Sequence, residues 1–159
     1  MENEFVDIWS KYEPEDEGVF IAYASIHGNT AKAAKKLAEM LEQKGAKIVA
    51  IADLSRDDMA EAVEDAFRHD KLVLASATYD GGLFPCMEDF MSHLKAKNFQ
   101  KRTVALMENG TWAPMAAKKM REYLEAMKEI AICEPVVTIK STMKEETLKL
   151  MAGLAEKLV

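Results

Sequence analysis

The sequence predicts an α/β domain built on a doubly wound five-stranded parallel sheet with helices on both faces. Five short apolar runs recur along the chain, and within each run the apolar residues do not alternate with polar ones. Strands that are buried on both faces have this continuous pattern. A helical repeat of apolar residues follows each run, and this alternation predicts right-handed crossovers between parallel strands. The 159 residues fit one domain.

The predicted strands are short and distributed along the whole chain. They span, in order, residues 19–24, 48–51, 72–75, 103–107 and 136–139. A first helix is expected because apolar residues repeat at helical spacing over 34–41, and it is expected to end at Lys44-Gly45, since glycine readily ends a helix. A shorter apolar stripe over 59–67 predicts the second helix.

The other three predicted helices have clearer start signals. Pro85 and Pro114 each precede an apolar stripe and stand where the first turn of a helix tolerates proline. Thr142 with Glu145 three residues later forms a capping box, and the apolar stripe over 148–158 predicts the last helix. A helix therefore follows each of the five predicted strands.

The first 17 residues differ in character from the rest of the chain. Residues 13–17 are acidic and contain a proline, and several bulky apolar residues precede them. We therefore expect residues 1–17 to be an acidic linker or N-terminal arm and residues 18–159 to form the folded domain.

The composition argues against several classes of partner. With 27 acidic and 21 basic residues the net charge is −6, so the electrostatic field opposes nucleic acids and anionic membranes. There is no N-terminal secretion signal, and no apolar run approaches the roughly 20 residues that a membrane span needs. Cys86 and Cys133 lack the spacing of metal ligands or redox motifs, which predicts a reducing compartment and a packing role for both thiols. The expected location is cytoplasmic, with no nucleic acid and no membrane as partner.

Residues 25–30, Ser-Ile-His-Gly-Asn-Thr, are the most informative segment for function. They follow the first apolar run and lead directly into the first predicted helix. A helix N-terminus has unpartnered N–H groups and a partial positive charge, so it binds phosphate readily. No Lys or Arg lies between 25 and 31, so the loop suits the monophosphate of a cofactor better than a triphosphate. The alternative is an ordinary helix cap after a strand.

Two further loops carry unusual residues. Ligands bind parallel sheets at the carboxyl ends of the strands, where the strand order reverses, so the ends of the first, third and fourth predicted strands are expected to lie side by side. Residues 78–85 contain a pair of glycines beside Tyr79, and residues 109–114 contain a Gly-Thr-Trp turn. Bare amides and aromatic faces suit a flat heterocycle with polar edges. A phosphate in the first loop and a ring between the other two fit flavin mononucleotide (FMN), although each loop alone could be only a turn.

The three loops together resemble those of a known family. Residues 25–30 resemble the flavodoxin phosphate loop, and the whole chain resembles the C-terminal flavodoxin-like domain of flavodiiron proteins, the A-type flavoproteins. Residues 78–82 with Phe84-Pro85 are similar to that family's second flavin loop, and residues 109–112 stand where the family has a Gly-Ser-x-Gly-Trp turn. Residues 5–12 resemble its interdomain connector. The resemblance implies a flavodoxin-like sheet with the strand order 2-1-3-4-5.

The resemblance also implies FMN as the cofactor and assigns residues to it. The implied phosphate-binding residues are Ser25, Ile26, His27, Gly28, Asn29 and Thr30. The implied ring-binding residues are Thr78, Tyr79, Asp80, Gly81, Gly82, Asn109, Gly110, Thr111 and Trp112. No residue is assigned a catalytic role, and none is assigned as a metal ligand.

Three positions depart from the family pattern. His27 stands where many flavodoxins have Ser or Thr, Ala77 replaces a common Pro, and Glu108 replaces a Gly. A carboxylate near a phosphorylated, reducible ring is expected to weaken its binding or lower its potential, unless the side chain turns to solvent.

The implied function is electron transfer by bound FMN. Flavodiiron proteins use such a domain to supply a di-iron site that reduces oxygen or nitric oxide, and the three histidines of this chain are too few and too scattered for that site. The expected partners are a redox donor such as rubredoxin or a reductase, and a di-iron domain as acceptor. The alternatives are a flavin-dependent NAD(P)H quinone reductase and a receiver-like signalling module, although the acidic pair that a receiver needs after its first strand is missing.

Overall fold

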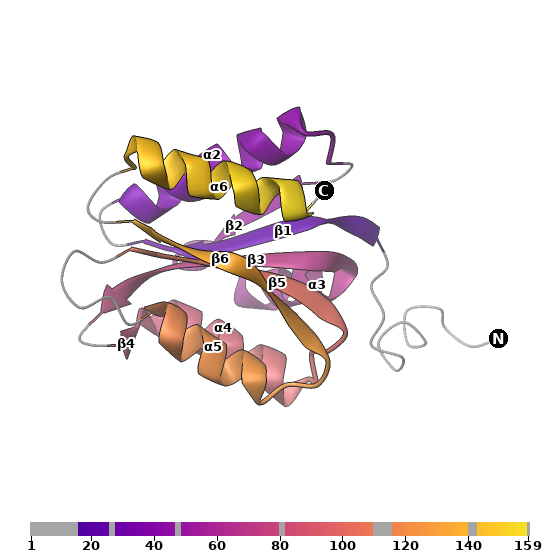
Figure 1. The fold of residues 1–159 in the computed structure, drawn as a ribbon. Coiled ribbons are helices and arrows are strands. Elements are labelled where there is room, and N and C mark those ends of the chain that lie inside the picture. Colours follow the sequence, from indigo (N-terminus) through magenta and orange to yellow (C-terminus); the bar gives the residue numbers. More distant parts are fainter. Residues whose placement is uncertain are drawn as a thin grey trace.

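A β-sheet between two layers of helices forms the part of the chain that the structure describes (Figure 1). This computed structural model describes residues 16–25, 28–46, 49–79, 82–109, 116–139 and 143–158. The strands are β1 (Asp16–Ala24), β2 (Val49–Asp53), β3 (His69–Tyr79), β4 (Gly82–Leu83), β5 (Arg102–Asn109) and β6 (Ile130–Ile139). The helices are α2 (Asn29–Gln43), α3 (Met59–Arg68), α4 (Pro85–Ala96), α5 (Ala116–Glu125) and α6 (Glu145–Leu158).

The five long strands are parallel and lie in the order β2-β1-β3-β5-β6. Counted along the chain without β4, this is the order 2-1-3-4-5, so the predicted flavodoxin-like sheet is confirmed. The two residues of β4 pair antiparallel with the end of β3. Two residues are too few to give a hydrophobic pattern, and this strand is absent from the prediction.

Several strands extend beyond the apolar runs that predict them. β3 begins at His69 and β6 at Ile130, well before the predicted starts at 72 and 136. The ladder continues through partly exposed positions, and Arg102 at the start of β5 pairs with Ile130. β1 begins at Asp16, and residues 1–15 of the predicted arm lie outside the described residues.

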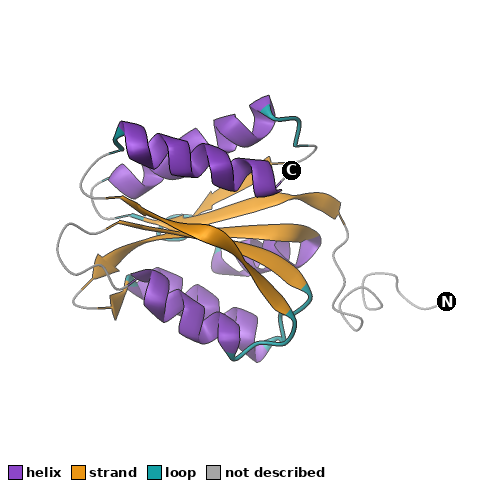
Figure 2. Cartoon of the chain, in the orientation of Figure 1, coloured by secondary structure: helices purple, strands orange, loops and turns teal. Residues whose placement is uncertain are grey.

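The helices form one layer on each face of the sheet. α2 and α6 cover one face, and α3, α4 and α5 cover the other, as Figure 2 also shows. The core under α2 and α6 includes Ile21, Leu37, Val73, Met107, Met151 and Leu154. The core under α3, α4 and α5 includes Phe20, Leu72, Met87, Phe90, Leu106 and Met120. None of the helices that the structure describes is long and apolar enough to cross a membrane.

Helix α2 ends where the sequence predicts. Its last residue is Gln43, and Gly45 adopts a left-handed conformation with φ +93°. The Gly45 N–H donates to the carbonyl oxygen of Glu42 at 3.1 Å, and the Ala46 N–H donates to that of Leu41 at 3.0 Å. These two bonds satisfy carbonyls that the helix would otherwise leave open, which is why glycine is favoured at this position.

The predicted start of helix α4 is confirmed. α4 begins at Pro85, as the proline signal predicts. α5 begins at Ala116, in agreement with the predicted stripe. α6 begins at Glu145, two residues later than the capping box predicts, because that motif would make Glu145 the third helical residue. Pro114 and Thr142 lie outside the described residues.

A buried arginine joins several elements at the amino end of β5. Arg102 is 3% exposed, and burial lowers its pKa to about 10. Its guanidinium donates to the carbonyl oxygens of Phe67 at 2.7 Å, Gln100 at 2.6 Å and His69 at 3.1 Å. It also lies over the rings of Phe67 and Phe99, 5.9 and 5.3 Å from their centroids. Arg102 thereby ties the end of α3 and the start of β3 to the turn before β5.

Replacement of Arg102 by Met should lower the free energy of unfolding by about 3 kcal/mol, because buried carbonyl oxygens lose their donor. Arg102→Lys should restore only part of the loss, since one ammonium cannot match the planar fork of the guanidinium. The measurement is urea unfolding, with Lys95→Met as the control that removes an exposed charge near the end of α4. Equal unfolding midpoints for Arg102→Met and Lys95→Met would contradict the role given to Arg102.

Cys86 behaves as a packing residue. It is the second residue of α4, is partly buried, and packs against the core under α3, α4 and α5. Burial raises the pKa of its thiol, and the negative charge of Asp53 raises it further. The protonated thiol is therefore favoured at neutral pH, which supports the predicted packing role over an activated thiolate.

In a Cys133→Ser variant, alkylation of Cys86 by iodoacetamide should be slower at pH 7 than alkylation of free glutathione. Because only the thiolate reacts and its pKa is raised, the rate should still be increasing at pH 9, the ordinary value for this group. The pH profile of the rate constant provides the check. A rate that reaches its plateau near neutral pH would show an activated thiolate.

Candidate functional site

The carboxyl ends of β1, β3 and β5 lie next to one another at one edge of the sheet. Ala24 of β1 pairs with Ser76 of β3, Ser76 pairs with Glu108 of β5, and Glu108 pairs with Thr138 of β6. The three predicted loops begin just beyond this row. The strand order reverses at β1, with β2 on one side and β3 on the other, so this is the edge where parallel sheets bind ligands. The predicted adjacency of the three strand ends is confirmed.

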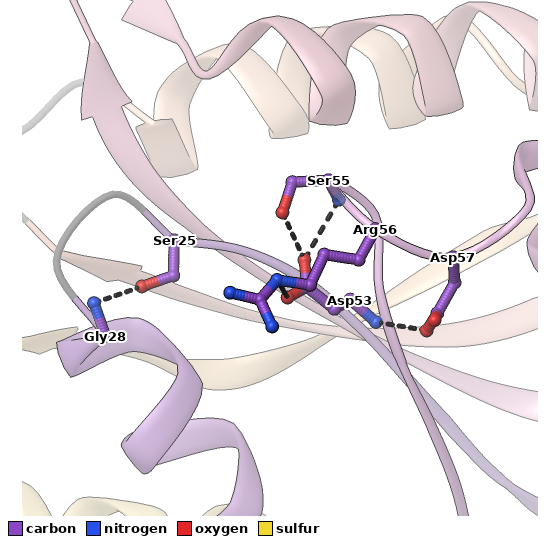
Figure 3. A network of polar contacts seen from close by, with 6 residues as sticks. All are labelled: Ser25, Gly28, Asp53, Ser55, Arg56 and Asp57. Atoms are coloured by element: carbon purple, nitrogen blue, oxygen red, sulfur yellow. Dashed lines mark hydrogen bonds and ion pairs between the residues drawn. The ribbon is translucent and has the colours of Figure 1, made fainter.

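The described part of the first loop is a tight turn (Figure 3). The backbone N–H of Gly28 donates to Oγ of Ser25 at 2.9 Å, and the N–H of Lys32 donates to the carbonyl oxygen of Gly28 at 2.9 Å. Gly28 has φ +85°, a conformation that side chains rarely adopt, and nothing lies within 4 Å of the position that a Cβ would occupy there. The turn therefore needs glycine for its backbone conformation and leaves open space beside it.

The first turn of α2 fits an anion. In the described part of the chain, no side chain caps this helix N-terminus. Thr30, the second residue of the helix, is 1% exposed, and its hydroxyl oxygen has no hydrogen-bond partner there. A buried hydroxyl without a partner costs free energy, and a phosphate oxygen bound at this turn would supply the missing acceptor. The residues present thus fit the phosphate of a cofactor.

A second ordered turn lies at the end of β2, beside β1 (Figure 3). Oδ1 of Asp53 accepts hydrogen bonds from the N–H of Ser55 at 2.9 Å and from its hydroxyl at 2.6 Å. Oδ2 of Asp57 accepts from the N–H of Asp53 at 2.8 Å. Nε of the exposed Arg56 lies 3.9 Å from Oδ2 of Asp53, whose side chain is partly buried. This turn is absent from the predicted site, although an Asp followed two residues later by Ser is a recognised turn signal.

The second predicted loop begins with a short antiparallel pairing. Thr78 pairs with Leu83, and Tyr79 pairs with Gly82. Asp80 and Gly81, which connect the paired residues, lie outside the described residues. An Asp-Gly pair between extended segments is a common hairpin signal, and it could have predicted β4.

The third predicted loop is described only at its ends. Asn109 is the last residue of β5, is half-buried and pairs with Ala77 of β3 and Ile139 of β6. Seven of the predicted site residues fall outside the described part of the chain: Ile26, His27, Asp80, Gly81, Gly110, Thr111 and Trp112. Their roles stay predictions.

Glu108 does not turn to solvent. It is 8% exposed, and both oxygens of its carboxylate accept hydrogen bonds. Oε1 accepts from the backbone N–H of Ala117 in α5 at 3.0 Å, and Oε2 accepts from the hydroxyl of Thr138 at 2.8 Å. The sequence identifies this residue only as a departure from a family pattern, because its partners are distant along the chain.

Among the residues that the structure describes, no group of three or more His, Cys, Asp or Glu side chains could hold a metal ion.

The comparisons with known proteins agree with this geometry. The model of the flavodoxin domain family matches residues 20–146. Among solved structures, rubredoxin oxygen:oxidoreductase from Desulfovibrio gigas is similar with a TM-score of 0.86 and 18% identity, over 94% of this chain and 37% of that protein. A variant flavo di-iron protein from Thermotoga maritima is similar with a TM-score of 0.76 and 22% identity, over 98% of this chain and 39% of that protein. Comparison with curated protein sequences gives no match.

A flavodoxin from the domain Archaea is also similar, with a TM-score of 0.70 and 23% identity over 90% of this chain and 99% of that protein. The chain thus spans nearly the whole of a flavodoxin but only 37% of the oxidoreductase. The family match covers most of the chain, and the observed strand order is the one expected for a flavodoxin-like fold. The chain therefore belongs to the flavodoxin domain family and is an FMN-binding electron-transfer module.

Proposed function

We propose that this chain is the flavin domain of a flavodiiron system and passes electrons from a redox protein to a di-iron domain. The observation that carries the proposal is the TM-score of 0.86 with the Desulfovibrio gigas oxidoreductase, against 0.70 with the archaeal flavodoxin. The backbone of this chain follows a portion of the larger oxidoreductase more closely than it follows that flavodoxin.

The proposed phosphate site is the turn of residues 25–30 with the N-terminus of α2. FMN supplies the electron-transfer chemistry when bound. The Ser25 hydroxyl holds the N–H of Gly28 and so fixes the turn. The hydroxyl of Thr30 and the uncapped N–H groups of α2 are available to a phosphate oxygen. Because no Lys or Arg stands between 25 and 31, neutral donors and the helix dipole carry the recognition.

The proposed ring site lies between the ends of β3 and β5. Its members are residues 78–82 and 109–112, and the pairing of Ala77 with Asn109 places the starts of both segments side by side. Backbone amides of these segments would hold the polar edge of the ring, and Tyr79 or Trp112 would stack on its face.

The proposed partners follow from the similar oxidoreductase. Its name identifies rubredoxin and oxygen as its substrates, and we propose rubredoxin or a reductase as the donor here and a separate di-iron domain as the acceptor. Residues 1–15, which precede β1, would serve as the connector to that domain. A reducing, cytoplasmic compartment suits Cys86 and Cys133, which lack the spacing of metal ligands or redox motifs.

Replacement of Thr30 by Val should weaken FMN binding about tenfold, since a hydrogen bond to a charged phosphate is lost. Riboflavin, which lacks the phosphate, should bind both proteins equally. The apoprotein should be as stable as the wild type or more stable, because the variant no longer buries an unpartnered hydroxyl. Flavin fluorescence quenching and urea unfolding provide the two measurements.

The matched control for Thr30→Val is Thr147→Val. Thr147 is also buried in the first turn of a helix, α6, on the same face of the sheet. This control should leave the affinity for FMN unchanged. Equal losses of affinity for FMN and riboflavin in Thr30→Val would contradict the assignment of Thr30 to the phosphate.

Reduced rubredoxin, mixed without oxygen with the FMN-loaded protein, should bleach the visible absorbance of the flavin, whereas NADH at the same concentration should not. The reason is that the proposed site receives electrons from a docked protein and holds no nicotinamide. Stopped-flow absorbance makes the measurement, with apoprotein as the control. Rapid oxidation of NADH in the presence of a quinone would favour the reductase alternative instead.

A further inference from the structure

Glu108 is a buried carboxylate that the proposed contacts with FMN do not use. It is the last residue of β5 that faces the layer of α3, α4 and α5, in line with the core residues Val104 and Leu106. Only 8% of the residue is exposed. A buried carboxylate is costly unless hydrogen bonds satisfy it, so its partners indicate what it does.

The two partners of Glu108 belong to different elements. Ala117 is the second residue of α5, and its N–H is one of those that a helix leaves without an intrahelical partner. Thr138 lies on β6 directly opposite Glu108. The side chain of Glu108 therefore connects the carboxyl end of β5, through hydrogen bonds, to the first turn of α5 and to β6.

This arrangement separates two effects of the carboxylate. Its negative charge lies at the positive end of α5, where the helix dipole favours it. As a bare charge it would repel a phosphorylated ligand and weaken its binding. Through its hydrogen bonds it would strengthen binding, because Asn109, a member of the proposed ring site, and the start of α5 would be held in place before the ligand binds.

We propose that Glu108 is a positioning residue for the ring half of the flavin site. Its two hydrogen bonds hold Asn109 and the first turn of α5 in fixed relative positions, so that the ring meets a preformed edge. The inference rests on the proposed FMN site and adds to it a residue that does not touch the cofactor.

The variants Glu108→Ala and Glu108→Gln distinguish the effect of the two hydrogen bonds of Glu108 from the effect of its negative charge. Glutamine has no charge, but its amide oxygen can accept from the Ala117 N–H and its NH₂ group can donate to the Thr138 hydroxyl. Glu108→Ala should bind both FMN and riboflavin about tenfold more weakly, because a buried N–H loses its acceptor and the edge is no longer held. Glu108→Gln should stay within about twofold of the wild type for both ligands.

Two further variants complete the experiment. Glu122→Ala removes the same charge from an exposed position on α5 and should leave both dissociation constants unchanged. Thr138→Val keeps the hydrogen bond from Ala117 to Glu108 and removes the one from Thr138. It should therefore weaken the binding of both ligands about threefold. This milder variant keeps the proposal testable if Glu108→Ala does not fold. Fluorescence quenching of FMN and of riboflavin provides the dissociation constants, and urea unfolding of each apoprotein runs in parallel.

Two results would overturn the positioning role. One is tighter binding of FMN by both Glu108 variants with little change for riboflavin, which would show that only the charge matters. The other is unchanged binding of both ligands by Glu108→Ala or, if that protein does not fold, by Thr138→Val. If the wild-type chain binds neither ligand, the FMN site itself is wrong. That failure is distinct from one in which the wild type binds flavin and the variants match it.

Discussion

Burial of the central strands on both faces is the constraint on which this architecture depends. In β1 and β3, Ile21 and Val73 face the layer of α2 and α6, whereas Phe20 and Leu72 face the opposite layer, and all four are buried. Neither face can be left to water, so the chain returns to the sheet through helices that cover each face, and the strands become parallel. Parallel strands have all their carboxyl ends at one edge. The location of the candidate site therefore follows from the way helices cover both faces of the sheet.

The sequence predicts the elements well where the apolar pattern is local, and less well at their ends. The stop at Gly45 follows from one residue and its conformation. The start of β6 at Ile130 does not follow from local residues, because the register of its pairing with β5 shifts between the partners of Ala105 and Met107. Two apolar runs on either side of that irregularity belong to one strand, and only the second run resembles a strand in isolation.

The candidate site divides in the same way. Ser25, Gly28 and Thr30 lie within one turn, and their residue types already indicate a helix N-terminus suited to phosphate. Glu108 gives no such signal, since its partner Thr138 is 30 residues away and Ala117 belongs to the next helix. Only the fold brings these groups together, and only the fold shows that a carboxylate at this position is satisfied.

The two ends of β5 carry opposite buried charges, Arg102 and Glu108, and this has a consequence for how the strand is aligned. A slip of β5 by two residues would leave the same faces of its apolar side chains turned to the same cores, so hydrophobicity alone resists it weakly. The guanidinium would then leave the carbonyls of Phe67 and His69, and the carboxylate would leave the amide of Ala117. A buried charge that has lost its hydrogen-bond partners strongly destabilises the fold. Arg102 and Glu108 together therefore favour one register of β5 against its neighbouring strands.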